Sequence, residues 1–272
     1  MWYNADMMRA DTVGAVRLVT APEGRRYDHS IPQSTEPGAK SRRVFVCLRG
    51  AIVTHTARIV AITQPRIADQ PEMTAAQFVA YAARVSNPAN QSNSMTATRL
   101  LRYLIEHRHW SPFEMVHVVM EITTTRDIGR QIIRHRSFSF QEFSQRFATV
   151  EAPAVWREAR MQAASNRQSS TTTDDTDVIS AWHVIQARVA HDAKTAYEEA
   201  LALGIAREQA RALLTEGLTA TRMYMAGTLR SWIHYIDVRI TADTQHEHRL
   251  VALDAQREIL SVVPELSAYW KQ

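Results

Sequence analysis

The feature that most constrains the fold is a change of apolar periodicity in the middle of the chain. Over residues 115–124 apolar side chains alternate with other residues, so that Val116, Val118 and Met120 share one side, as in a strand with one buried face. Over residues 126–135 the apolar spacing becomes helical. A core strand that passes directly into an amphipathic helix predicts a sheet with helices packed against it.

Similar patterns elsewhere predict further elements of both kinds. The predicted strands are residues 57–62 and 221–226, and the predicted helices are residues 74–83, 95–107, 177–203, 206–214, 230–239 and 243–262, with a polar loop at 166–173. No repeat, low-complexity tract or linker interrupts residues 57–272. We therefore predict an α+β fold, a helix-rich single domain with a small mixed or antiparallel sheet, over residues 54–272.

Residues 1–53 differ in composition from the rest of the chain. They are richer in glycine and proline and show no helical periodicity over residues 24–40, which predicts a partly disordered N-terminal extension. A natural start further along the chain is the alternative. Arg42 and Arg43 resemble a twin-arginine export signal, but they lie far from the N-terminus, so we do not expect export.

Composition narrows the cellular setting and the partners. Cys47 is the one cysteine, so the chain has neither an intramolecular disulfide nor a thiolate metal cluster, and no apolar run approaches the roughly 18 residues of a membrane span. We expect a cytoplasmic protein with no membrane partner. A net charge of +4 favours anionic ligands but is too small to argue for wrapping nucleic acid, which we do not expect as a partner.

Residues 134–147 carry the chemistry that packing alone does not require. Arg134, His135 and Arg136 precede serines, a carboxylate and closely spaced aromatic rings. Guanidinium groups bind phosphate through two parallel hydrogen bonds, hydroxyls add further bonds, and aromatic rings stack on other rings. The segment therefore predicts a site for a phosphorylated ligand that contains a ring, and a solvated basic loop is the alternative.

A row of arginines leads into this segment. Arg126, Arg130 and Arg134 recur at intervals of four and share one helix face. Like charges at this spacing cost about 0.2–0.5 kcal/mol per pair. The row therefore suggests a bound anion that offsets the repulsion, with a solvated charged face as the alternative for Arg126.

Several other chemistries are poorly supported by the sequence. The pairs His107/His109 and His246/His248 are spaced i, i+2, whereas metal ligands on helices recur at i, i+3 or i+4, so we assign no metal site. Neither a glycine-rich phosphate loop nor a serine elbow is present. An enzyme of this kind would work with a bound cofactor and positioned charges rather than with a protein nucleophile.

At residues 134–147 the sequence closely resembles the signature of flavin-dependent thymidylate synthases. The agreeing residues are Arg134, His135, Arg136, Ser139, Glu142, Ser144 and Arg146. Residues 109–114, with the order His-Trp-Ser-Pro-Phe-Glu, and residues 84–86 resemble two earlier elements of the family, and the resemblance covers roughly residues 57–262. The departures from the usual family residues are Gln141 for asparagine, Phe147 for tyrosine, Thr215 for proline and Ala226 for asparagine.

The resemblance implies a reaction and its ligands. Members convert dUMP to dTMP with 5,10-methylenetetrahydrofolate as the one-carbon donor and NADPH-reduced FAD as the source of hydride, without a cysteine nucleophile. They are homotetramers with a mixed α/β fold in which the active sites lie at subunit interfaces. A catalytically impaired nucleotide- or RNA-binding homologue is the alternative, suggested by Ala226, Phe147 and the basic charge balance.

The resemblance also assigns residues by matched position. Those implied to bind FAD are Ser86, Ser111, Arg134, His135, Arg136, Gln141, Glu142, Arg230 and His234. Those implied to bind dUMP are Gln131, Ser144, Arg146, Arg211 and Arg239. Arg239 and His109 are the expected catalytic residues, with a hydrogen-bonded core histidine as the alternative for His109. We expect Trp232, Tyr235 and Phe113 to be core or stacking residues rather than reactive groups.

Overall fold

The computed structural model describes residues 55–270. The predicted extension, residues 1–53, lies outside this range, so its disorder and its boundary with the following domain stay predictions. Within residues 55–270 no helix combines the length and the apolar character that a membrane span requires.

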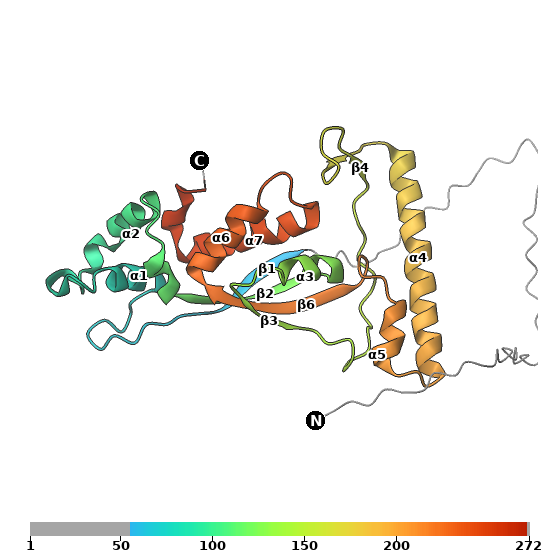
Figure 1. The fold of residues 1–272 in the computed structure, drawn as a ribbon, viewed down its shortest axis with the longest axis horizontal. Coiled ribbons are helices and arrows are strands. Elements are labelled where there is room, and N and C mark those ends of the chain that lie inside the picture. The colour runs from blue at the N-terminus through green and yellow to red at the C-terminus, as the bar shows by residue number, and fades with distance from the viewer. Residues whose placement is uncertain (1–54, 271–272) are drawn as a thin grey trace, which may run out of the picture. The chain divides into compact units, whose positions relative to one another are not determined.

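The centre of the domain is an antiparallel sheet of four strands (Figure 1). The strands are β1 (Thr56–Ile62), β2 (His117–Thr125), β6 (Ala220–Thr228) and β3 (Ser139–Glu142), and they lie in the order β1-β2-β6-β3. The β2–β6 pairing runs without interruption from His117 opposite Thr228 to Thr125 opposite Ala220. The sheet is antiparallel throughout, which is one of the two predicted arrangements, mixed or antiparallel.

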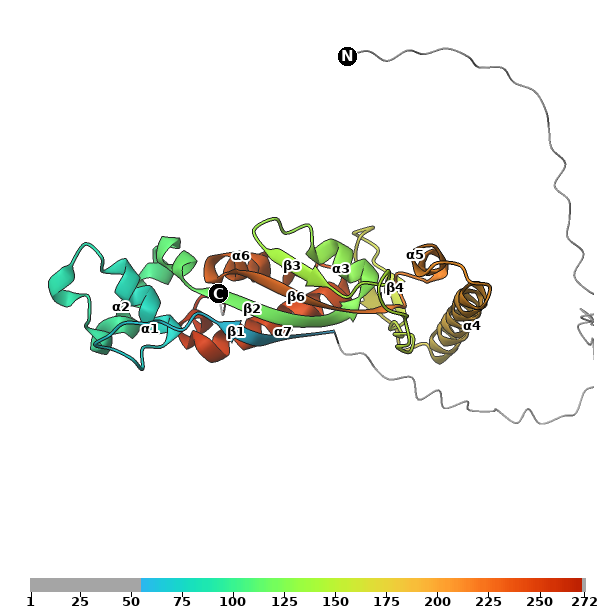
Figure 2. The ribbon, with the colours of Figure 1, turned by 90° about the horizontal axis from the view of Figure 1, so that it is seen from below.

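Helices cover one face of this sheet. They are α3 (Arg126–Ile132), α6 (Leu229–Arg239) and α7 (His246–Val262), and Figures 1 and 2 show them on the same side of the strands. The alternation expected for β2 is confirmed, because Val118, Met120 and Ile122 are fully buried beneath the helices. The side chains between them point to the opposite face, where no helix of the described residues lies across the strands.

Two groups of helices lie beyond opposite ends of the central strands (Figure 1). Next to the start of β2 are α1 (Ala75–Ala83), α2 (Ala97–Glu106) and the 3-10 helix η3 (Ser111–Met115). Beyond the other end are α4 (Thr176–Ala202), α5 (Arg207–Ala210) and the 3-10 helix η4 (Arg211–Leu213). The nine residues of β2 separate the two groups by roughly 30 Å, at ~3.3 Å per residue.

Local signals in the sequence account for the helix ends. Thr74 accepts a hydrogen bond from the Gln77 backbone N–H while the Gln77 side chain accepts from the Thr74 backbone, so a capping box starts α1. Asp175 caps α4 by accepting hydrogen bonds from the backbone N–H groups of Asp177 and Val178, and Gly204, with a φ of +82°, follows the end of that helix. Both starts agree with the predicted helices.

Two segments that were predicted as loops contain strands. The segment 134–147 includes β3, a strand of four residues in which Phe140 is the one apolar side chain, and its extended shape comes from pairing with β6. The loop predicted at 166–173 includes β5 (Ser170–Thr172), which pairs with β4 (Arg160–Gln162). The helix predicted for 126–135 ends at Ile132, and turns follow.

Two members of the arginine row form ion pairs with carboxylates of the chain itself. Arg126 is buried, and its Nη1 lies 3.0 Å from Glu142 Oε1. Arg130 Nη2 lies 3.3 Å from Glu216 Oε1. Carboxylates of the chain itself therefore offset these two charges, and sequence spacing does not reveal partners so far away in the sequence.

Candidate functional site

His135 and Arg239 meet at the end of α6. Arg239 is the last residue of that helix, and its Nε donates to His135 Nε2 over 2.9 Å, so this ring nitrogen must be unprotonated. Burial, together with the charges of Arg239 and His234, lowers the pKa of His135 to about 4. The pair is a neutral imidazole that holds a guanidinium in one direction.

Strand β3 divides the signature residues between the two faces of the sheet. Gln141 pairs with Tyr224 and points to the uncovered face, whereas Glu142 pairs with the buried Met223 and points toward the helices. Glu142 Oε1 accepts hydrogen bonds from Arg126 and from Thr221, over 3.0 and 2.8 Å. Glu142 is therefore tied to the domain core, while Gln141 is exposed.

A close contact between Gly227 and Phe138 holds the signature segment against the sheet. A β-carbon on Gly227 would overlap the Phe138 ring, so only glycine leaves room for the ring at this point of β6. Phe138 also packs edge-to-face against Trp232, with the ring centroids 4.9 Å apart. The position of the signature relative to α6 depends on this contact.

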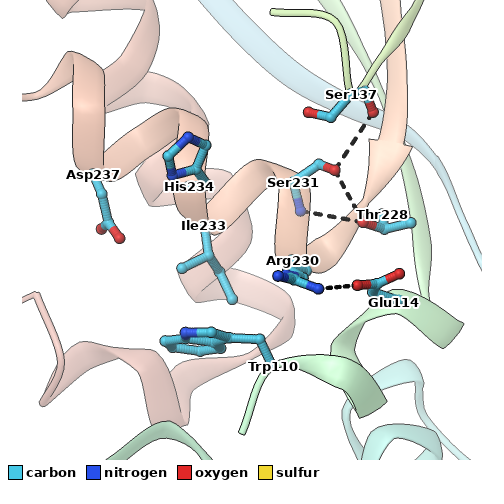
Figure 3. A pocket seen from close by; sticks show the side chains of 9 residues that line it. All are labelled: Trp110, Glu114, Ser137, Thr228, Arg230, Ser231, Ile233, His234 and Asp237. Carbon is cyan, nitrogen blue, oxygen red and sulfur yellow. Dashed lines mark hydrogen bonds and ion pairs between the residues drawn. The ribbon is translucent and has the colours of Figure 1, made fainter. Parts of the chain in front are cut away.

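A cavity of about 600 Å³ opens beside the first turns of α6 (Figure 3). Arg230 and His234 line it, and the Arg230 guanidinium pairs with the Glu114 carboxylate. Thr228 caps the same helix end by accepting a hydrogen bond from the Ser231 backbone N–H, and the Ser231 hydroxyl donates to the Ser137 carbonyl. Glu114 was not among the predicted site residues, although it ends the His-Trp-Ser-Pro-Phe-Glu element, which was the available signal.

A second group of predicted residues gathers near α5. Ser144, Arg146 and the exposed Phe147 line a cavity of about 450 Å³ with Arg207 and Glu208. Ser144 and Arg146 are exposed, whereas Gln145 between them, at the start of a turn, is buried. Arg146 Nη2 lies 3.4 Å from Glu208 Oε2, and both side chains are more than half exposed. Arg211 follows one turn after Glu208 and opens η4.

Three predicted residues lie beyond the other end of β2. Ser86 follows α1 and lines a cavity of about 690 Å³ with Arg84 and Arg99. Ser111 opens η3 and is exposed. His109 is also exposed, next to Arg108 with its φ of +56°, so the alternative of a core histidine is wrong. The structure of one chain does not bring these residues to Ser144 and Arg146.

Gln131 belongs to a network that sequence reasoning missed. Its Nε2 donates to Gln245 Oε1 over 2.6 Å, and its Oε1 lies 3.2 Å from His248 Nδ1. His248 Nε2 in turn lies 3.1 Å from the Tyr235 hydroxyl. His248 had been considered only as a metal ligand. It lies thirteen residues after Tyr235 and in a different helix, so no helical spacing in the sequence predicts their contact. Tyr235 is fully buried, as are Trp232 and Phe113, which confirms all three as core residues.

Comparisons with known proteins agree with this arrangement. The fold is similar to that of the UMP/dUMP methylase PolB from Streptomyces cacaoi, solved with 5-Br dUMP, with a TM-score of 0.67, 24% identity and coverage of 81% of this chain and 96% of that one. The family model described as thymidylate synthase complementing protein matches residues 70–265.

Two curated relatives are more similar in sequence. The flavin-dependent thymidylate synthase of Synechocystis sp. is 45% identical over 212 residues, which cover 78% of this chain and 97% of the relative. The probable flavin-dependent thymidylate synthase of Paramecium bursaria Chlorella virus 1 is 45% identical over 193 residues, with coverage of 71% and 88%. The chain belongs to the flavin-dependent thymidylate synthase family.

Proposed function

We propose that this chain is a thymidylate synthase that methylates C5 of dUMP. 5,10-Methylenetetrahydrofolate supplies the carbon, and FAD, when bound and reduced by NADPH, supplies the hydride that completes the methyl group. The observation that carries the proposal is the hydrogen bond from Arg239 at the end of α6 to His135 of the family signature. No cysteine lies within residues 55–270, which agrees with a reaction that does not use a thiolate.

The residues present suit the FAD diphosphate and the polar edge of its ring system. Arg134 and Arg136 are exposed, and neither belongs to an ion pair of the described residues. A phosphate between two guanidinium groups forms charge-assisted hydrogen bonds, which are roughly twice as strong as neutral ones. We assign FAD binding to Ser86, Ser111, Arg134, His135, Arg136, Gln141, Glu142, Arg230 and His234. Among these, Glu142 contributes through its ion pair with Arg126.

Residues near α5 suit the phosphate of dUMP. Ser144 and Arg146 are both exposed, and the Arg146–Glu208 ion pair is weak because solvent screens both groups. A dianionic phosphate competes readily with such a carboxylate. We assign dUMP binding to Gln131, Ser144, Arg146, Arg211 and Arg239.

Arg239 is the residue that we expect to activate the uracil ring. His135 occupies its Nε, so the guanidinium is fixed in direction while its terminal nitrogens stay available as donors. A fixed cation stabilises the negative charge that develops on a ring oxygen as C5 becomes nucleophilic. His109 is proposed to lie near the flavin and the folate, on an exposed surface beside Tyr103, with ring centroids 6.1 Å apart.

Self-association into a homotetramer explains how the separated residues serve one reaction. Ser86 and His109 lie beyond the opposite end of β2 from Ser144 and Arg146, roughly 30 Å away along the strand. Helix α4 also leaves apolar side chains exposed, including Val184 at 67%. Apolar surface of this kind is typical of a protein interface. We propose that sites are completed by residues of other subunits; the cytoplasmic location stays a prediction.

Tritium release tests the proposed reaction directly. Protein supplied with FAD, NADPH and methylenetetrahydrofolate is expected to release tritium from C5 of labelled dUMP and to show flavin absorbance after gel filtration. A folded protein that binds no FAD and releases no tritium would contradict the proposal. Nucleic-acid binding with a steep salt dependence in that case would instead support the non-catalytic homologue.

A further inference from the structure

Gln131 lies in the middle of a continuous row of hydrogen bonds that ends on an ion pair. Starting from Gln131, the row passes to Gln245 and then to Glu247, because Gln245 Nε2 donates to Glu247 Oε2 over 3.1 Å. In the other direction it passes through His248 to Tyr235. Every member except Gln245 is at least partly buried, so water does not freely replace these partners.

One charged group fixes the direction of every bond in this row. Glu247 is ionised and can only accept, so Gln245 must turn its NH₂ group toward Glu247 and its oxygen toward Gln131. Gln131 must then turn its own NH₂ group toward Gln245 and its oxygen toward His248. A glutamine amide has two nearly equal orientations in isolation, and here the chain of partners permits one.

Arg157 keeps Glu247 ionised. Its Nη1 lies 3.0 Å from Glu247 Oε2, and both side chains are about nine-tenths buried. Burial by itself raises the pKa of Glu247, but the charge of Arg157, a backbone N–H and the bonds from Gln245 and Arg157 together leave the pKa below its ordinary value. Arg157 is itself held, since its Nη2 lies 2.6 Å from Asp127 Oδ1 and its Nε donates to the Gly217 carbonyl.

His248 closes the other end of the row in one tautomer. Because Gln131 presents an oxygen, His248 Nδ1 must carry the proton, and Nε2 must accept from the Tyr235 hydroxyl. His248 and Tyr235 are both fully buried. Neither ring has an alternative partner among the hydrogen bonds of the described residues, so the tautomer and the Gln131 orientation support each other.

We propose that Glu247, Gln245 and His248 are positioning residues that hold the Gln131 amide in one orientation toward the nucleotide. The inference rests on the proposed function, in which Gln131 contacts dUMP. Gln131 keeps one N–H and one oxygen lone pair for the ligand, and the row decides on which side each of them lies. A Gln131 amide that turns over would present an acceptor where the base requires a donor, and the hydrogen bond to the base would be lost.

The test compares two substitutions that each remove one carboxylate partner of Arg157. Glu247→Gln keeps the size of the side chain but gives it an amide that both donates and accepts, so the direction of the row is no longer fixed. Loss of one neutral hydrogen bond to substrate is expected to raise KM for dUMP about two- to tenfold, with flavin content unchanged. Asp127→Asn removes the other ion pair outside the row and is expected to leave KM within about twofold of wild type.

A double-mutant cycle separates positioning from general destabilisation. In a Gln131→Ala background, Glu247→Gln is expected to cause no further rise in KM, because the residue through which it acts is gone. Gln245→Ala changes an exposed residue and removes no ion pair, so it is the second variant if Glu247→Gln fails to fold. It is expected to raise KM for dUMP in the wild-type background and to cause no further rise in the Gln131→Ala background. Additive effects on KM in both cycles would overturn the inference.

The outcomes also separate this inference from the proposed function. Wild-type protein that does not bind dUMP would contradict the function itself. The positioning role alone would be overturned by a different set of results. Wild type would turn dUMP over and Gln131→Ala would have a raised KM, but Glu247→Gln and Gln245→Ala would have a normal KM. An equal rise of KM in Asp127→Asn and Glu247→Gln would also overturn it, because the effect would then come from the loss of an Arg157 ion pair.

Discussion

The neutrality of His248 predicts a specific loss of stability in acid. Burial lowers the pKa of His248 to about 3 in the folded protein, and the nearby charges of Arg239 and His135 act in the same direction, whereas the ordinary value is 6.5. At a pH below this ordinary pKa, the histidine of the unfolded chain binds a proton that the histidine of the folded protein does not take up. The stability that this histidine contributes is therefore complete above about pH 6.5 and is lost as the pH falls toward the folded pKa.

The size of the loss follows from the two pKa values. Each pH unit below the unfolded pKa lowers the free energy of unfolding by about 1.4 kcal/mol until the folded pKa is reached. At about pH 4.5 the loss is roughly 2.7 kcal/mol, and it stays the same for any folded pKa well below that pH. His248→Gln removes the titrating group, so it abolishes this part of the pH dependence.

Urea unfolding measures the effect. Wild type and His248→Gln are unfolded as flavin-free protein at one fixed concentration, near pH 7.5 and about pH 4.5. The fall in the free energy of unfolding between the two pH values is expected to be larger for wild type by about 2–3 kcal/mol. Titrating groups that lie away from His248 contribute to both proteins and cancel. Equal falls in the two proteins would refute the description of His248 as a buried neutral imidazole.

Three further substitutions test the site and the interfaces. Gly227→Ala is expected to displace the Phe138 ring and lower the free energy of unfolding by about 1–3 kcal/mol, measured by urea titration. Arg136→Ala is expected to lose bound flavin, seen in the absorbance spectrum, whereas Arg239→Ala is expected to keep flavin and lose most tritium release; normal flavin and rate in both would refute these roles. Val184→Glu is expected to shift the mass measured by light scattering below that of wild type, and a fully active monomer would contradict sites shared between subunits.

Much of the fold was predictable because its elements carry local signals. The alternation in β2 was predicted and is confirmed, and the caps at Thr74 and Asp175 and the stop at Gly204 are likewise set by neighbouring residues. Strand β3 was not predicted, because it is only four residues long and its extended conformation depends on pairing with β6, which is distant in the sequence. The shortness of its strands also explains the missed β4–β5 hairpin.

The site was predictable in its composition but not in its internal bonding. The signature indicated which residues gather for ligands, and His135 and Arg239 do meet. The partners that fix these residues come from distant parts of the sequence: Arg126 pairs with Glu142, and Gln131 bonds to His248, which lies 117 residues away. Such contacts depend on tertiary packing, and no spacing rule within one helix or strand anticipates them.

The antiparallel pairing of β2 with β6 has a consequence for how the chain folds. The whole of residues 126–219, with α3, β3 and α4, lies between these two strands in the sequence. Closing so long a connection costs chain entropy before the central strand pair is formed, which is typical of slowly folding topologies. Since β3 pairs with β6 alone, this strand of the signature cannot pair until β6 has joined the sheet. A nascent chain that ends before residue 220 therefore contains the signature and the β1–β2 pair but lacks β6, the strand with which β3 pairs.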